Sequence, residues 1–96
     1  MKNSSLTLYL EINHLSFIFL VGESDEYEQF KIVYNLVLPI QGIENNKITD
    51  LEVVSDLIKK NIYIIEQRFN HTFKEVVLIV ENFESTFINF SGFKKV

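Results

Sequence analysis

The chain has 96 residues, of which 47% are hydrophobic and 23% charged, so its length supports one compact domain and excludes two. Its net charge of −4 argues against nucleic acid as a partner, because binding to phosphate backbones needs a basic surface. The chain has no cysteine, which excludes disulfides, thiolate metal sites and cysteine nucleophiles.

No segment is suited to crossing or entering a membrane. The longest apolar stretch, Leu15 to Val21, is far shorter than the roughly 20 residues that a span needs. The residues after Met1 do not form a basic region followed by a hydrophobic core, as a secretory signal does. We therefore expect a soluble, cytoplasmic and unprocessed chain that does not insert directly into a membrane.

Three strands are predicted before residue 40. Residues 6–12 alternate between apolar and polar, which is typical of a strand with one buried face. Residues 15–22 are apolar on both faces, which predicts a strand covered on both sides. Residues 30–39 are rich in β-branched and aromatic side chains and end at Pro39. The turn at Asn13-His14 and the acidic segment 23–29 separate these strands, so we expect an antiparallel meander.

A long helix is predicted after the turn-like stretch 41–47. Thr49 and Glu52 are spaced as in a capping box, in which the hydroxyl and the carboxylate each accept from a backbone amide. About 20 residues then follow helical spacing up to a predicted stop at Asn70-His71. The apolar stripe expected to pack on the sheet consists of Leu51, Val54, Ile58, Ile62, Ile65 and Phe69.

A second apolar patch lies on another flank of this helix, where one sheet face would not cover it. Its members are Val53, Leu57 and Ile64. Two interpretations stay open: the patch is buried by the chain's own segment 87–93, or it is covered by another domain or a partner chain. In either case we interpret it as a packing or interaction surface and not as a catalytic one.

The remaining elements complete an α/β fold. Residues 75–81 read as a buried fourth strand, and residues 85–93 as a weakly extended tail. A right-handed crossover through the helix predicts a β-β-β-α-β mixed sheet in the order 3-2-1-4. Such a sheet favours helices on both faces. Only one long helix is predicted, so we expect one uncovered face and self-association.

Three segments in this order resemble a known family. They are LEINHLSFIFLVGE, PIQGIENNKITDLEVVSDLIKKNI and FKEVVLIVENFESTFINFSG. They are similar to the N-terminal segment of FtsA, the actin-like bacterial cell-division ATPase that links the FtsZ ring to the membrane. The resemblance implies that residues 1–82 form part of an actin-like, ribonuclease H-like ATPase subdomain. It also implies that residues 83–96 are an extended tail leading into the next subdomain.

The resemblance also implies a phosphate loop at the first hairpin turn. The family has an acidic residue there, followed by a hydrophobic residue, Gly and a small hydroxyl residue. Glu11 retains the acid, whereas Asn13 stands at the Gly position and His14 at the hydroxyl position. A Cβ at the Gly position hinders the approach of backbone amides to phosphate oxygens. We therefore interpret Glu11, Asn13 and His14 as a degenerate phosphate loop, with Asn13 able to adopt a left-handed conformation.

The family protein is several-fold longer, which bears on cofactors and partners. We expect no cofactor for this chain alone, and ATP with magnesium only in a longer protein. The partners implied are other FtsA-like domains or FtsZ, and the location implied is the inner face of the membrane, reached through the rest of the protein. These inferences treat the chain as the front part of an FtsA-like protein.

The residues themselves offer no catalytic set and no metal site. Neither His14 nor His71 has a second ligand at metal-binding spacing, and no serine lies in a nucleophile elbow. Two hypotheses follow. The chain is either the N-terminal part of an FtsA-like protein or a free-standing α/β interaction module without nucleotide.

Overall fold

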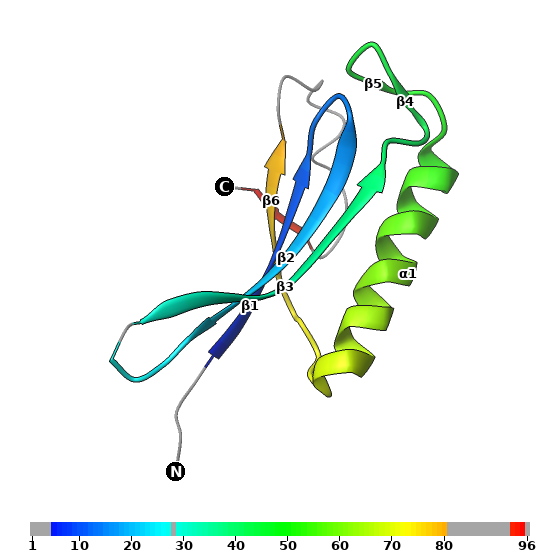
Figure 1. Ribbon diagram of the computed structural model, residues 1–96. Helices are drawn as coiled ribbons and strands as arrows, with labels where there is room; N and C mark the ends of the chain where they lie inside the picture. The colour runs from blue at the N-terminus through cyan, green and yellow to red at the C-terminus, as the bar shows by residue number, and fades with distance from the viewer. Residues whose placement is uncertain (1–4, 28, 81–92, 96) are drawn as a thin grey trace.

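The computed structural model describes residues 5–27, 29–80 and 93–95, which form one sheet, one long helix and a small hairpin (Figure 1). The elements in chain order are β1 (Ser5–Ile12), β2 (Ser16–Ser24), β3 (Phe30–Pro39), β4 (Ile43–Glu44), β5 (Lys47–Ile48), α1 (Leu51–Phe69), β6 (Val76–Val80) and β7 (Phe93–Lys95).

The main sheet has the strand order β3-β2-β1-β6-β7. Strands β1, β2 and β3 form an antiparallel meander, and β6 pairs in parallel with β1, with Leu8 opposite Val76. The predicted α/β class and the four-strand order 3-2-1-4 are thus confirmed. Strand β7, which pairs in parallel with β6, adds a fifth strand that the sequence did not predict. The rest of the predicted tail, 83–92 and 96, lies outside the described residues.

Helix α1 begins and ends where the sequence has the appropriate capping residues. Its N-cap is Asp50, whose carboxylate accepts from the Val53 amide at 3.1 Å; the prediction of Thr49 as the cap was wrong by one residue. Its C-cap is Asn70 in the left-handed conformation, which confirms the predicted stop. Within the described part of the chain, no helix combines the length and apolarity needed to cross a bilayer.

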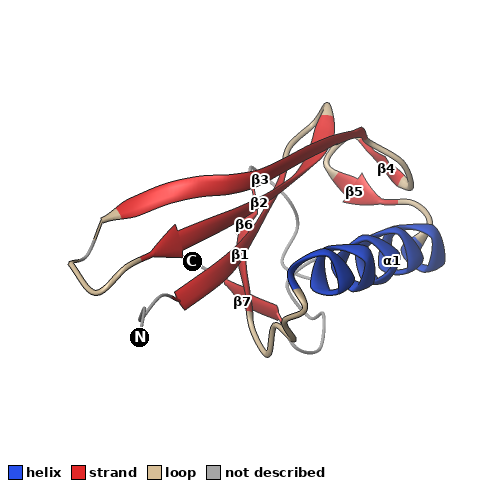
Figure 2. Cartoon of the chain, turned by 60° about the horizontal axis from the view of Figure 1, so that its bottom comes forward, coloured by secondary structure: helices blue, strands red, loops and turns tan. Residues whose placement is uncertain are grey.

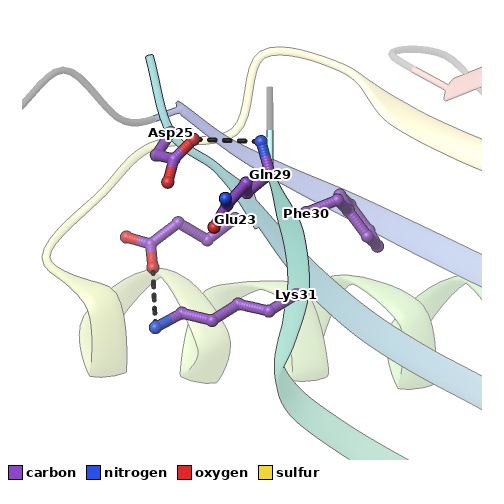
Figure 3. A pocket seen from close by; sticks show the side chains of 5 residues that line it. All are labelled: Glu23, Asp25, Gln29, Phe30 and Lys31. Carbon is purple, nitrogen blue, oxygen red and sulfur yellow. Dashed lines mark hydrogen bonds and ion pairs between the residues drawn. The ribbon is translucent and has the colours of Figure 1, made fainter. Parts of the chain in front are cut away.

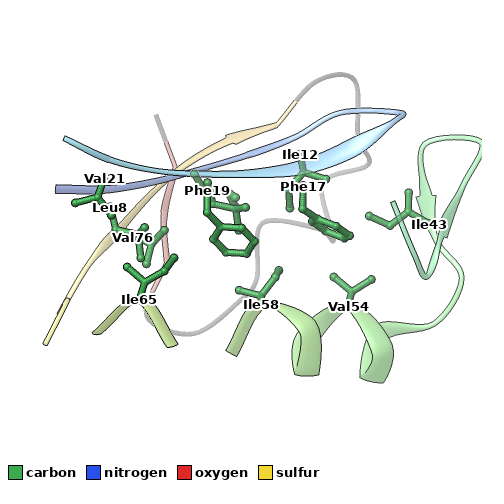
Figure 4. Close-up of a cluster of buried hydrophobic side chains, with 12 residues drawn as sticks. Leu8, Ile12, Phe17, Phe19, Val21, Ile43, Val54, Ile58, Ile65 and Val76 are labelled. Carbon is green, nitrogen blue, oxygen red and sulfur yellow. The ribbon is translucent and has the colours of Figure 1, made fainter. Parts of the chain in front are cut away.

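The core lies between the sheet and this one helix, as Figures 2 and 4 show. Phe17 and Phe19 project from β2 toward Val54 and Ile58 of α1, and all four side chains are fully buried. Alternate residues of β1 and β6 extend the same layer. The buried side chains of the described residues are all hydrophobic: Leu8, Leu10, Ile12, Phe17, Phe19, Val21, Ile43, Val54, Ile58, Ile65, Val76 and Leu78.

No described helix covers the other side of the sheet, which we call the second face. Ile18 and Leu20 lie there on β2, half-buried, opposite Val37 and Asn35 of β3. Leu15, which we expected to begin the second strand, lies in the preceding turn and is 68% exposed. Among the described elements the sheet therefore has a helix on one face only, as the sequence predicted.

The stretch 41–47, predicted as a turn, holds most of a small hairpin of β4 and β5, which ends at Ile48. Asn45 and Asn46 both have positive φ, the combination that a two-residue type I′ hairpin turn requires. Gly42 precedes the hairpin with φ +73°, and its carbonyl accepts from the amides of Thr49 and Asp50 at 2.7 and 3.1 Å. The hairpin is thereby fastened to the start of α1.

Candidate functional site

The turn between β1 and β2 carries the three residues of the predicted phosphate loop. Glu11 is next to last in β1, where it lies opposite Ile18 of β2 and Ile79 of β6. Its neighbours Leu10 and Ile12 point into the core, so its own side chain lies on the second face, where it is half-buried. The turn thus lies at the carboxyl ends of the parallel strands β1 and β6, the edge where α/β sheets commonly bind ligands.

Asn13 organises this turn through its side chain. Its Oδ1 accepts from the backbone amides of Leu15 and Ser16, each at 2.8 Å. Its Nδ2 donates to Glu11 Oε2 at 3.2 Å, and its backbone amide donates to the Ser16 carbonyl at 3.1 Å. A single carboxamide therefore joins the end of β1 to the beginning of β2.

These hydrogen bonds change the interpretation of the loop. The positive-φ residues of the described chain are Gly42, Asn45, Asn46 and Asn70, so Asn13 does not use the left-handed conformation that asparagine tolerates. Asn13 instead forms an Asx turn, in which its side-chain oxygen satisfies the amides two and three residues later. That oxygen occupies the position at which an anion could accept from the same amides. The residue types alone did not indicate that the Asn13 side chain would accept from these amides.

His14 and Leu15 form the exposed outer part of the turn. The Leu15 carbonyl accepts from the Ile40 amide at 3.0 Å, which ties the turn to the residue that follows β3. The structure therefore brings Glu11 and Asn13 into direct contact through the Asn13 Nδ2–Glu11 Oε2 hydrogen bond.

A small hollow lies at the opposite end of the meander, beside the loop that joins β2 to β3 (Figure 3). It measures about 150 Å³, and its lining includes Glu23, Asp25 and Lys31. Asp25 accepts from the Tyr27 and Gln29 amides, and Lys31 lies 3.8 Å from Glu23 with 69% of its side chain exposed. Across residues 5–27, 29–80 and 93–95, no cluster of three His, Asp or Glu side chains is arranged to hold a metal ion.

The predicted interaction surface on α1 divides into two environments. Leu57 follows Val54 by three positions and packs against the core at its margin. Val53 and Ile64 are 38% and 45% exposed. Leu51, assigned to the buried stripe, is 60% exposed as the first helical residue, so that assignment was wrong.

No protein-family model matches the chain, and no curated protein matches it significantly.

The hydrogen bonds of the Asn13 side chain should contribute to the stability of the folded chain. We expect Asn13→Ala to lower the free energy of unfolding by about 1–3 kcal/mol, because the Leu15 and Ser16 amides lose their acceptor. The measurement is urea denaturation followed by circular dichroism. Asn13→Asp is the matched control: it keeps the acceptor oxygen, although it places a carboxylate beside Glu11. An Ala variant as stable as the native chain would show that the Asx turn contributes nothing.

Proposed function

We propose that this chain is the front part of an FtsA-like cell-division protein, contributing a degenerate phosphate loop and a packing surface to a protein that links the FtsZ ring to the membrane. The observation that carries the proposal is the order of elements: an antiparallel meander, then a helix, then a strand parallel to β1. This is the arrangement that the sequence resemblance implies for the first part of the ATPase domain.

The turn at Asn13 supports a role without nucleotide binding at this loop. An approaching phosphate group would compete with Asn13 Oδ1 for the Leu15 and Ser16 amides. The Asn13 carboxamide is already attached to the chain, so it loses little entropy when it accepts from these amides. A free nucleotide would lose its translational and rotational entropy on binding to them. We infer that the loop is closed by its own side chain, and that ATP with magnesium would need other parts of a longer protein.

The proposal places the chain in the cytoplasm, at the inner face of the membrane through the rest of the protein. Its partners would be other FtsA-like domains or FtsZ. Within this assignment the second face of the sheet, with Ile18, Leu20 and Ile79, is a surface for packing against further domains.

A second candidate function is a free-standing protein–protein interaction module without nucleotide. Two observations favour it: the loop satisfied by Asn13, and exposed apolar side chains on the described part of the sheet, such as Ile32 at 50% and Val37 at 57%. The two candidates differ in the size of the native protein and in its location.

The test uses an antibody raised against this chain, applied to the cells that produce it. For the FtsA-like protein we expect a band several-fold heavier than 11.3 kDa, a ring at the division site and co-precipitation of FtsZ. A band at 11.3 kDa, distributed through the cell and free of FtsZ, would overturn the first candidate and favour the interaction module. Staining with antibody preabsorbed on the purified chain is the control.

A further inference from the structure

Strand β3 forms one edge of the sheet, and no described strand lies beyond it (Figure 2). It is ten residues long, whereas β7 at the other edge has three. The Ile40 amide donates to the Leu15 carbonyl, which fixes the alternation of hydrogen bonds between β2 and β3. By this alternation the amides of Leu36 and Leu38 point toward β2, and those of Asn35 and Val37 point away from the sheet.

Lys31 near the start of β3 is charged, but the rest of the strand, from Ile32 to Pro39, has none of the charges with which natural edge strands discourage pairing. Residues 32–43 contain no Asp, Glu, Lys or Arg. The side chains whose backbone groups point outward lie on the second face, and several are apolar: Phe30, Ile32 and Val37 are 50–57% exposed. Free hydrogen-bonding groups and exposed apolar side chains therefore coincide on the same residues.

The geometry of this edge restricts what can pair with it. The register shift at Val21/Gly22 interrupts the first half of β3, so the regular stretch runs from Tyr34 to Pro39. Pro39 has no amide hydrogen to donate. Asn35 and Val37 remain as the residues of this stretch that offer both an outward N–H and an outward C=O.

We propose that a second copy of this chain pairs with β3 in antiparallel orientation, about a two-fold axis at Leu36. In this register Asn35 of each copy exchanges two hydrogen bonds with Val37 of the other, so the edge is complementary to itself. Because the regular stretch is uncharged, the axis brings no like charges together in a chain that carries a net charge of −4. This inference is independent of the FtsA-like assignment.

The pairing joins two sheets into one continuous sheet. Since the axis is perpendicular to the sheet, both α1 helices lie on the same side. The second faces then form one continuous surface on the opposite side, with the Val37 side chains near its centre. The contact itself consists mainly of backbone hydrogen bonds, as in other cases of pairing at a sheet edge.

The test removes one outward amide. We expect the native chain to have a mass of twice 11.3 kDa by light scattering after gel filtration. Val37→Pro should be monomeric, with a dimer dissociation constant at least tenfold larger than that of the native chain. The Val37 amide points away from β2, so proline there leaves the internal ladder intact. Val37→Thr, which keeps the amide and the β-branched shape, is the matched control and should remain dimeric.

Further variants keep the outcome interpretable. Circular dichroism establishes that each variant is folded, and Asn35→Pro replaces Val37→Pro if the latter is not. Ile18→Lys charges the middle of the second face without touching the edge, so it should leave the dimer intact. A native chain that is monomeric up to millimolar concentration would overturn the proposal. So would a dimer that survives loss of the amide but is dissociated by Ile18→Lys, because its contact would then be face to face.

Discussion

We expect Ile58→Ala to lower the free energy of unfolding by about 2–5 kcal/mol. Ile58 is fully buried in the middle of α1, where it faces Phe17 and Phe19 across the core. A domain of this length is stabilised by about 5–14 kcal/mol in total, so the loss is a large fraction of its stability. The substitution leaves a cavity between the sheet and α1, because the surrounding side chains relax into the space only partially.

The measurement is urea denaturation monitored by circular dichroism, with the midpoint and slope compared between variants. Ile64→Ala is the matched control, because it is the same substitution in the same helix at a side chain that is 45% exposed. It should change stability by no more than about 1 kcal/mol, since alanine favours the helix and little burial is lost. Equal losses for the two variants would contradict the assigned orientation of α1.

We also expect Gly42→Ala to destabilise the fold by about 1–3 kcal/mol. Gly42 has φ +73°, which side chains with a Cβ seldom adopt. A Cβ there would lie 2.8 Å from the Asp50 carbonyl oxygen and 2.8 Å from Val54 Cγ2. The substitution therefore forces apart the turn whose carbonyl accepts from Thr49 and Asp50, and with it the start of α1.

Gly22→Ala provides the comparison for this prediction. A Cβ at Gly22 would also meet a neighbour, but the neighbour is the ring of Phe30, which is 52% exposed and can rotate away. We therefore expect a smaller loss in Gly22→Ala, measured by thermal melting of both variants. A Gly22→Ala loss equal to or larger than that of Gly42→Ala would show that the Phe30 ring is held more firmly than the turn.

The sequence predicted the parts of the fold that depend on periodicity and chain handedness. The spacing of Val54, Ile58 and Ile65 placed the helix and its buried face, and the right-handed crossover placed β6 beside β1. Both rules act over many residues, so single exceptions do not obscure them.

The details that the sequence did not predict depend on one or two residues or on distant contacts. Thr49 and Asp50 both suit an N-cap and the amides of both donate to the Gly42 carbonyl, so the residue types alone do not distinguish them. Leu51 shares the helical stripe, but its burial depends on how far the sheet extends. At the candidate site, the residue types did not distinguish a left-handed Asn13 from one whose side chain accepts two amides.

The pairing of β1 with β6 has a consequence for the growing chain on the ribosome. Strands β1, β2 and β3 are consecutive and joined by short turns, so they can associate as soon as they emerge. Strand β6, which pairs with the other side of β1, is synthesised only after α1, so Leu8 cannot pair with Val76 until then. Until then the emerging meander has β1 at its border, with unpaired backbone groups and Leu8 and Leu10 uncovered. Protection of the nascent chain during this interval therefore depends on how quickly residues 41–80 are synthesised, or on a chaperone that binds the meander first.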